Sequence, residues 1–315
     1  MTYGGSCSSS STSATADNNT VTFNTLSVAT YSDCTIKVTD SAGNFSNTLT
    51  ISTFVIVVWK QESYIKAANN DAGDSFGYSV SISGDTMVVG AFREGSNQTT
   101  ITNGTTASSN DSNSESGAVY VYKRTGTSWA QEAYIKAANN DAGDYFGISV
   151  SISGDTMVVG ASREGSNQTT ITNGTNASSD DSSTNGAVYV YKRTGTNWAQ
   201  EAYIKAANGD SSDSFGERVS IDNDTIVVGA IYEKSNQTTI TNGTTASSDD
   251  SNTQSGAVYV YKRTGTSWAQ EAYIKAANND AGDLFGISVS ISGDTMVVGA
   301  FNEDSNQTTI TNGTT

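Results

Sequence analysis

Pairs of aspartates three residues apart recur along the chain, in loops of the form NNDAGD or a looser copy of it. Calcium binds roughly six to eight oxygen atoms, which carboxylates and loop carbonyls supply. Neighbouring asparagine and glycine add oxygen atoms and flexibility, so calcium is the one cofactor that the sequence predicts. The alternative is turn chemistry, in which Asp and Asn bond their own backbone. The predicted metal-binding residues are Asp71 and Asp74, Asp141 and Asp144, Asp210 and Asp213, and Asp280 and Asp283.

The side chains used most often for catalysis near neutral pH are missing. The sequence has no histidine, which excludes Ser-His-Asp and Cys-His catalysis and zinc sites with histidine ligands. Carboxylate pairs remain, and we identify no acid–base pair among them. One glutamate in each repeat precedes a lysine by four residues, which indicates a solvent-exposed edge strand with opposite charges. These glutamates are Glu62, Glu132, Glu201 and Glu271.

The composition is strongly acidic. Of 315 residues, 35% are hydrophobic, 32 are acidic and 16 are basic, and the formal net charge is −16. Nucleic-acid binding depends on Lys and Arg contacts to phosphate, and anionic membranes attract basic segments. We therefore expect no nucleic-acid partner. We also expect no membrane insertion, because no segment approaches the roughly 20 apolar residues of a membrane span.

Four tryptophans divide most of the chain into repeats. Trp59, Trp129, Trp198 and Trp268 are separated by 70, 69 and 70 residues. A period of this size corresponds to one supersecondary unit per repeat, stacked on its neighbours. The predicted repeats are residues 59–128, 129–197, 198–267 and 268–315, the last of them truncated.

The second repeat is predicted to form four short strands in a meander. They are "WAQEAYIKA" (129–137), "ISVSISG" (148–154), "TMVVGA" (156–161) and "GAVYVYKR" (186–193). A Gly-Asp hairpin turn joins the second strand to the third. Strands that are apolar on both faces need a sheet above and a sheet below. The sequence therefore predicts an all-β fold of β-propeller blades, with a β-solenoid as the alternative. The truncated last repeat predicts an incomplete ring.

The strands "FGISVSISGDTMVVGA" and "GAVYVYKR", together with the tryptophan strand, resemble the FG-GAP repeat of integrin α-subunits and bacterial exported proteins. The resemblance covers residues 59–315 and implies an extracellular or cell-surface β-propeller. Two features depart from the family pattern. Gly-Ala-Pro reads Gly-Ala-Phe, Gly-Ala-Ser or Gly-Ala-Ile, and "SGDT" stands where the integrin calcium loop would lie. The family's calcium site is therefore not carried over to that position.

A long polar insert separates the two most apolar strands of each repeat. Its copies, at 93–116, 163–185 and 233–255, share "SNQTTITNGT" and differ at their tips. The segment "QTTIT" is predicted to form a small hairpin. Loops on one face of a repeat protein commonly bind partners, so the inserts are the predicted surface for a protein or carbohydrate ligand on a cell surface or matrix. A solvated loop without a ligand is the alternative.

The region 1–58 precedes the repeats and holds both cysteines. Cys7 and Cys34 fit no zinc motif, and we interpret them as a disulfide, which implies an oxidising, exported setting. Two free thiols are the alternative. The N-terminus has no signal-peptide pattern, and we expect the chain to be a fragment.

The stretch "ATYSDCTIKVTDSAGNFSNTLTIS" (29–52) resembles the C-terminal part of a bacterial Ig-like domain. The resemblance implies a partial β-sandwich, in which Tyr31 packs at a corner and Cys34 bridges the two sheets with Cys7 as its partner. The apolar segment "FVIVVW" (54–59) is predicted to be a buried strand.

These patterns predict a non-enzymatic exported or cell-surface repeat protein that mediates adhesion or binding through its propeller loops. The alternatives are a propeller enzyme acting on polysaccharide, a lyase or glycosidase, and a purely structural spacer. The third repeat diverges most, so the enzyme alternative rests on Glu217, Arg218 and Asp222. Convergence of these three side chains on the central channel would favour it.

Overall fold

The computed structural model describes residues 1–15, 19–179 and 183–306. Within these ranges the chain forms strands and no helix, and accordingly no helix there is long and apolar enough to cross a membrane. The chain divides into two compact units, Met1–Tyr64 and Ile65–Thr315. Each unit has buried clusters of its own.

Two small antiparallel sheets make up the N-terminal unit. One contains β1 (Thr2–Gly4), β3 (Thr35–Lys37) and β4 (Leu49–Thr50), and the other contains β2 (Ala29–Tyr31) and β5 (Phe54–Ile56). A disulfide joins Cys7 to Cys34, and both cysteines are buried with Tyr31. The Tyr31 hydroxyl donates to the carbonyl of Ser27, four residues upstream, at 2.9 Å, as a corner tyrosine does in Ig sandwiches. The Ig-like identity of this unit stays a prediction.

The segment 54–59 is neither fully a strand nor buried, so the prediction of a buried strand is wrong. β5 ends at Ile56, and Val57, Val58 and Trp59 are exposed, Trp59 by 95%. The reason lies in strand pairing. In later repeats the tryptophan strand pairs with an "AVYVYKRT" strand that precedes it, and no such strand precedes Trp59.

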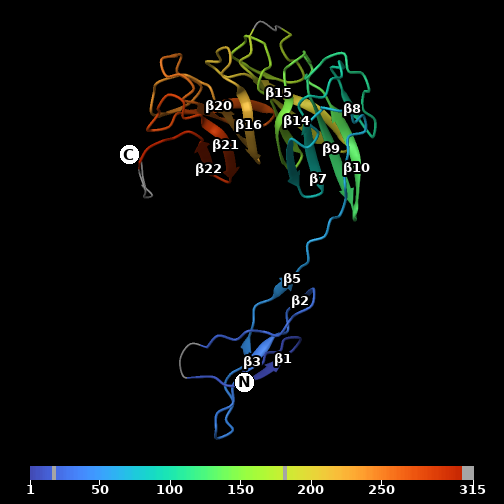
Figure 1. The fold of residues 1–315 in the computed structure, drawn as a ribbon, viewed down its shortest axis with the longest axis vertical. Coiled ribbons are helices and arrows are strands. Elements are labelled where there is room, and N and C mark those ends of the chain that lie inside the picture. The colour runs from blue at the N-terminus through green and yellow to red at the C-terminus, as the bar shows by residue number, and fades with distance from the viewer. Residues whose placement is uncertain (16–18, 180–182, 307–315) are drawn as a thin grey trace. The chain divides into compact units, whose positions relative to one another are not determined.

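The C-terminal unit consists of β-sheets that repeat one strand order, which confirms the all-β, blade-like fold. The first blade is β6 (Ser79–Ser83), β7 (Thr86–Ala91), β9 (Ala118–Thr125), β10 (Ser128–Ile135) and β8 (Ile101–Asn103). The second is β11 (Phe146–Ser153), β12 (Thr156–Ala161), β14 (Ala187–Thr194), β15 (Asn197–Ile204) and β13 (Ile171–Asn173). The third is β16 (Phe215–Asp222), β17 (Thr225–Ala230), β19 (Ala257–Thr264), β20 (Ser267–Ile274) and β18 (Ile240–Asn242). The last sheet is β21 (Phe285–Ser292) and β22 (Thr295–Ala300). Figure 1 shows these sheets following one another in chain order.

Blade and sequence repeat are offset by one strand. The tryptophan strand β10 pairs with β9, so it completes the blade of the preceding repeat. The four-strand meander is confirmed, but a fifth strand, β8, pairs with the outer edge of β10. The predicted hairpin in "QTTIT" is therefore wrong. The open edge of an outer strand offers unpaired backbone groups, and the insert satisfies them with one short strand.

Successive blades pack face to face through apolar side chains. Val119 and Val121 of the first blade join Val159, Tyr189 and Trp198 of the second in one buried cluster. The second and third blades repeat this packing. A Cβ on Gly160 would overlap the carbonyl oxygen of Gly216 in the next blade, so glycine allows the close approach.

Serine hydroxyls connect the inner strands of neighbouring blades. The N–H groups of Val219, Ile221 and Asn223 donate to the hydroxyls of Ser149, Ser151 and Ser153 at 3.0, 3.1 and 3.0 Å. The polar face of the inner strand is therefore part of a blade interface, because its hydroxyls accept hydrogen bonds from the backbone of the next blade.

Candidate functional site

The inserts and the aspartate loops lie at the same end of every blade. Chain direction reverses at each antiparallel strand, so the turns at 84–85 and 125–127 lie at one end, and the inserts and aspartate loops lie at the other. We call these the turn end and the loop end. Figure 1 shows the long loops along the upper rim of the blades. In the second insert, residues 180–182 lie outside the described residues.

In each aspartate loop the second carboxylate turns back on the loop backbone. Asp144 accepts the N–H of Asp141 at 3.1 Å, and the second aspartate of every pair is buried. The same bond joins Asp71 to Asp74, Asp210 to Asp213, and Asp280 to Asp283, at 3.2, 2.9 and 3.1 Å. This is the turn chemistry that the sequence offered as the alternative.

Calcium binding at these loops stays a prediction. The described residues contain no group of three or more Cys, Asp or Glu side chains that could hold a metal ion, so backbone carbonyls and waters would have to supply most ligands. Calcium titration with an EDTA control tests this: a ligand of the folded state raises the melting temperature, and an unchanged temperature favours turn chemistry alone.

The third aspartate loop differs from the others in charge. Lys234 Nζ lies 2.8 Å from Asp213 Oδ1, where the first two repeats have glycine, Gly95 and Gly165. Burial raises the pKa of Asp213 to about 6, and the hydrogen bond from Lys234 opposes this rise. A cation at this loop would have to displace the ammonium group, which makes it the least suitable of the four for a metal.

A buried polar cluster lies beneath each insert, and sequence reasoning missed it. Lys205 Nζ lies 2.6 Å from Glu164 Oε2, with side chains only 1% and 2% exposed, and it donates to Asn185 Oδ1 at 2.5 Å. The equivalent pairs are Lys136 with Glu94 at 2.8 Å and Lys275 with Glu233 at 2.7 Å. The interpretation of these lysines as solvent-exposed edge charges is therefore wrong.

This cluster ties both ends of the insert to the blade. Glu164 begins the second insert, Asn185 ends it, and Lys205 comes from the end of the outer strand. Asn139, in the aspartate loop that leads into the same blade, donates to Glu164 Oε1 at 2.7 Å. Asn140 donates to the carbonyl of Ser96 in the preceding insert at 3.0 Å. The loop end is therefore one connected surface, with fixed bases and exposed tips.

The sequence did contain a signal for this cluster. Glu94, Glu164 and Glu233 recur at the same position of the three inserts, and Glu303 at that position of the truncated fourth copy, while the residues beside them vary. A charged residue kept among variable polar neighbours indicates a specific partner. The sequence does not show which of several lysines is that partner.

Two of the four glutamates predicted to face solvent, Glu132 and Glu201, instead join neighbouring blades, whereas Glu62 and Glu271 are exposed as predicted. Glu132 on the outer strand of the first blade accepts from Trp198 Nε1 at 3.0 Å and from Arg193 at 3.2 Å. Glu201 accepts from Trp268 Nε1 and Arg263 in the same way. Glu132 and Glu201 have these partners because the next blade covers the outer strand on which each of them lies.

The three residues of the enzyme alternative do not converge. Arg218 pairs with its neighbour Glu217 at 2.9 Å. Asp222 lies at the other end of β16, about 16 Å along the strand, and accepts the N–H of Gly293 at 2.6 Å. Asp222 thus takes the place that serines hold in the other blades.

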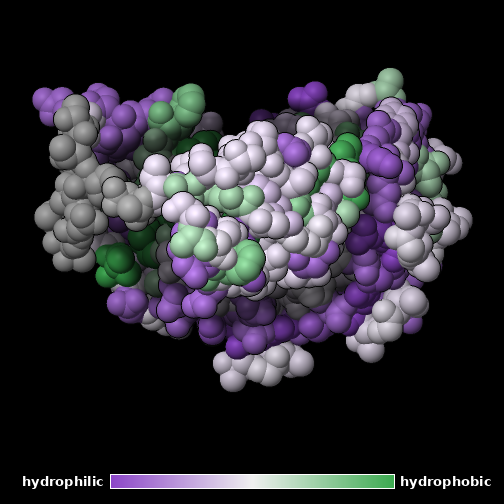
Figure 2. Space-filling view, turned by 90° about the horizontal axis from the view of Figure 1, so that it is seen from below, coloured by the Kyte–Doolittle hydropathy of each residue, from purple (hydrophilic) through white to green (hydrophobic). Residues whose placement is uncertain are grey.

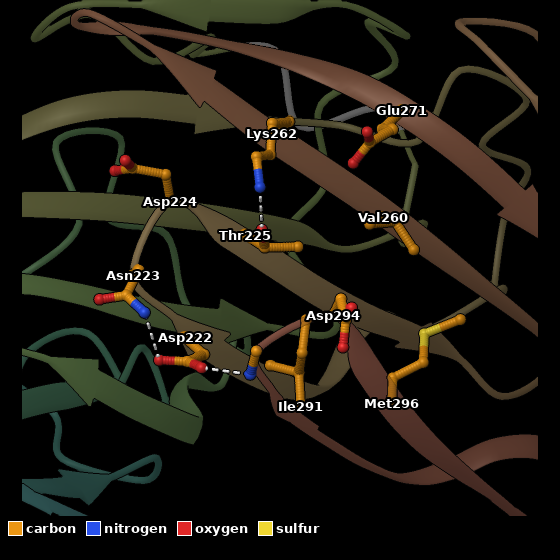
Figure 3. A pocket seen from close by; sticks show the side chains of 11 residues that line it. Asp222, Asn223, Asp224, Thr225, Val260, Lys262, Glu271, Ile291, Asp294 and Met296 are labelled. Atoms are coloured by element: carbon orange, nitrogen blue, oxygen red, sulfur yellow. Dashed lines mark hydrogen bonds between the residues drawn. The ribbon is translucent and has the colours of Figure 1, made fainter.

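A cavity of about 560 Å³ lies beside the last sheet and includes Asp222, Lys262, Glu271 and Asp294 (Figure 3). In the figure Lys262 is bonded to Thr225, and the acidic side chains point in different directions. The cavity lies along one edge of β22. In the equivalent strands β7, β12 and β17, this edge pairs with the third strand of the blade. The shape of the cavity therefore follows from the two-stranded sheet, and its side chains form no acid–base pair.

Comparison with known proteins agrees with the repeat pattern. A family model described as the FG-GAP repeat matches residues 59–122, 129–191, 198–261 and 268–313. No match was found among curated proteins. Each matched segment begins at a tryptophan and includes two strands joined by a tight turn, which is Gly-Asp in three repeats and Asn223-Asp224 in the third. Together these segments cover most of the chain. The chain therefore belongs to the FG-GAP repeat family.

Proposed function

We propose that this protein is an exported or cell-surface binding protein, which holds a protein or carbohydrate ligand on the exposed tips of its inserts. One observation carries the proposal: three inserts are each anchored at the base by a buried lysine–glutamate cluster, while the described tip residues 109–112 and 248–251 of the first and third inserts are exposed. A fixed base reduces the conformational entropy that a loop loses on binding. The tips carry Ser, Asn, Asp and Thr, whose side chains exchange hydrogen bonds with polar ligands.

Repetition strengthens this arrangement. Three inserts with a common base and different tips stand on adjacent blades. Several weak contacts to one polymer or one surface gain avidity when they are held at fixed spacing. An acidic surface, with a net charge of −16, favours neutral or basic ligands over polyanions. The disulfide of the N-terminal unit supports an oxidising location.

The experiment probes the full chain against immobilised polysaccharides and purified extracellular matrix proteins. A tip variant replaces residues 108–112 and 248–251 with Gly-Ser segments of equal length and leaves the anchoring residues intact. A control variant changes threonine to serine on both sides of Gly126 and Gly265 at the turn end. We expect binding to at least one probe, a loss of tenfold or more in the tip variant, and unchanged affinity in the control.

The outcomes distinguish the alternatives. Binding that survives the tip replacement would place the ligand elsewhere on the molecule. Absence of binding to every probe would favour a structural spacer. Release of shortened chains from a bound polysaccharide would favour the enzyme alternative.

A further inference from the structure

The first and last sheets of the C-terminal unit each present an exposed apolar face. Val80 and Ile82 on β6 are 63% and 60% exposed, and Val297 on β22 is 68% exposed. The equivalents of the first two in the second blade, Val150 and Ile152, are each only 6% exposed. Figure 2 shows the molecule from below, with hydrophobic residues in green among pale and purple ones. The exposed residues are therefore of the kind that elsewhere forms a blade junction.

The two exposed faces also match in extent. On the first blade, the outer half is already covered, because Ile65, Ala67 and Phe76 pack against Tyr120 and Tyr122. Only the inner part, around β6, is open. The last sheet consists of an inner pair of strands, β21 and β22. These strands are the equivalents of β6 and β7, so the last sheet matches the uncovered inner part of the first blade in extent.

The hydrogen-bonding groups of the two faces are complementary. At the first junction, the N–H groups of Ile152 and Gly154 donate to Ser81 and Ser83 at 3.2 and 3.0 Å. The corresponding N–H groups in the first blade, those of Ile82 and Gly84, receive no such serine from the described residues. At the other end, the corresponding hydroxyls of the last sheet are exposed, and no described blade lies beyond them. These hydroxyls belong to Ser288, Ser290 and Ser292.

The glycine contact of the junctions is also open at both faces. At each junction a glycine of the second strand lies against the carbonyl of a glycine in the next blade, as Gly160 does with Gly216. A Cβ on Gly77 would meet no atom within 4 Å. A Cβ on Gly299 would meet only atoms of its own sheet, on Ile287 and Ser288. Both glycines are thus available for the same approach.

We propose that copies of this chain associate head to tail, with the first blade of one copy stacked on the last sheet of another. The contact continues the blade interfaces that exist inside each chain, and it uses two different surfaces. A heterologous contact of this kind closes into a ring if the rotation permits and otherwise extends as a filament. The net charge of −16 opposes association, so salt, which screens repulsion, promotes it.

The first test is the mass of the full chain in solution, measured by light scattering after size exclusion, in high salt and over roughly a hundredfold range of concentration. We expect multiples of 32.8 kDa that increase with concentration. A constant mass of 32.8 kDa across the range would overturn the proposal.

Two variants test the geometry. Ile82→Asp blocks the first blade, and Val297→Asp blocks the last sheet; circular dichroism and melting verify that both fold, since both positions are already exposed. We expect each variant alone to remain at 32.8 kDa. A mixture of the two should form a dimer, because one intact face of each kind remains. The control Val58→Asp changes a residue that is 59% exposed in the N-terminal unit and should associate like the parent chain.

Other patterns would contradict the proposal. If only Ile82→Asp prevents association, the first blades pair with each other. If neither variant changes the mass, or their mixture forms no dimer, another surface is responsible. Loss of association in Val58→Asp would indicate nonspecific contact through exposed apolar residues.

Discussion

The buried lysine–glutamate pairs show how much a single charged residue depends on its surroundings. Burial lowers the pKa of Lys205, and the nearby Glu164 opposes this change. An ion pair in the interior loses hydration, and its mutual attraction and added hydrogen bonds offset that loss. Removing one partner leaves the other charge buried without compensation.

Replacement of Lys205 by methionine should therefore be severely destabilising. We expect Lys205→Met to lower the free energy of unfolding by about 3–5 kcal/mol, since Glu164 stays buried without its partner. Lys262→Met, at an exposed lysine on the neighbouring blade, should change it by about 0.5 kcal/mol or less. Urea unfolding followed by the fluorescence of the buried Trp198 and Trp268 measures both. Equal effects of the two substitutions would show that the ion pair contributes no special stability.

The raised pKa of Asp213 predicts that the stability of the folded chain decreases as the pH rises. Burial raises the pKa of Asp213 to about 6, above the usual 3.8, so the folded state binds the proton more tightly than the unfolded state. Stability from this group is present at low pH and is lost as the pH rises through about 6. Relative to Asp213→Asn, the parent chain should lose about 1–3 kcal/mol between about pH 4 and pH 6.5.

Chemical unfolding at several pH values measures this difference. Asp111→Asn, at an exposed aspartate, serves as the control and should follow the parent chain. If the difference between the parent chain and Asp213→Asn is constant with pH, or grows in the opposite direction, the proton is not held at Asp213.

At the scale of strands, Ser149, Ser151 and Ser153 form a row of hydroxyls that accept backbone N–H groups of the next blade, and we call this row the serine ladder. The ladder explains why a strand with one polar face can lie between two blades. The N–H groups at the open edge of β16 donate to these hydroxyls of β11. The backbone donors of β16 therefore have partners although no further strand pairs with that edge. The ladder fixes neighbouring blades in register, because the donors and acceptors recur at the strand period of two.

Removal of the ladder has a built-in control. The triple variant Ser149→Ala, Ser151→Ala and Ser153→Ala should lose about 2–4 kcal/mol, at roughly 1 kcal/mol for each hydrogen bond. The same triple change at Ser288, Ser290 and Ser292, whose side chains are exposed, should cost about 0.5 kcal/mol or less at low protein concentration. Denaturant titration distinguishes the two. Similar losses would mean that serine affects the strands themselves and not the junction.

The strands could be predicted from the sequence because alternation and turn residues are local signals. "ISVSIS" followed by Gly154 and Asp155 fixes a hairpin, and the structure has it as β11 and β12. The offset between blade and sequence repeat could not be predicted, because a repeat period does not say where a blade begins. The edge strand β8 was missed because three residues give too short a pattern.

The loop end was predictable in position but not in construction. The meander places every insert beside an aspartate loop, and this follows from strand order alone. The burial of Lys136, Lys205 and Lys275 does not follow, since a lysine four residues after a glutamate also fits an exposed strand. Their partners lie 42, 41 and 42 residues away in sequence, and only the folded blade brings them together.

At the scale of the whole molecule, the two compact units differ in what stabilises them. The C-terminal unit has continuous apolar clusters between its blades. The N-terminal unit has short strands and a small cluster around Cys7, Tyr31 and Cys34. Small units with little core commonly depend on a covalent link. The disulfide should therefore affect one unit only.

Replacement of both cysteines tests this division. The disulfide joins residues that are 27 positions apart, and a loop of that size contributes roughly 3–4 kcal/mol by restricting the unfolded chain. Cys7→Ser with Cys34→Ser should abolish or markedly lower the melting transition of the N-terminal unit and leave that of the C-terminal unit unchanged. Differential scanning calorimetry of the full chain resolves the two transitions, and reduced parent protein should behave like the variant. A joint shift of both transitions would instead mean that the two units unfold as one cooperative block.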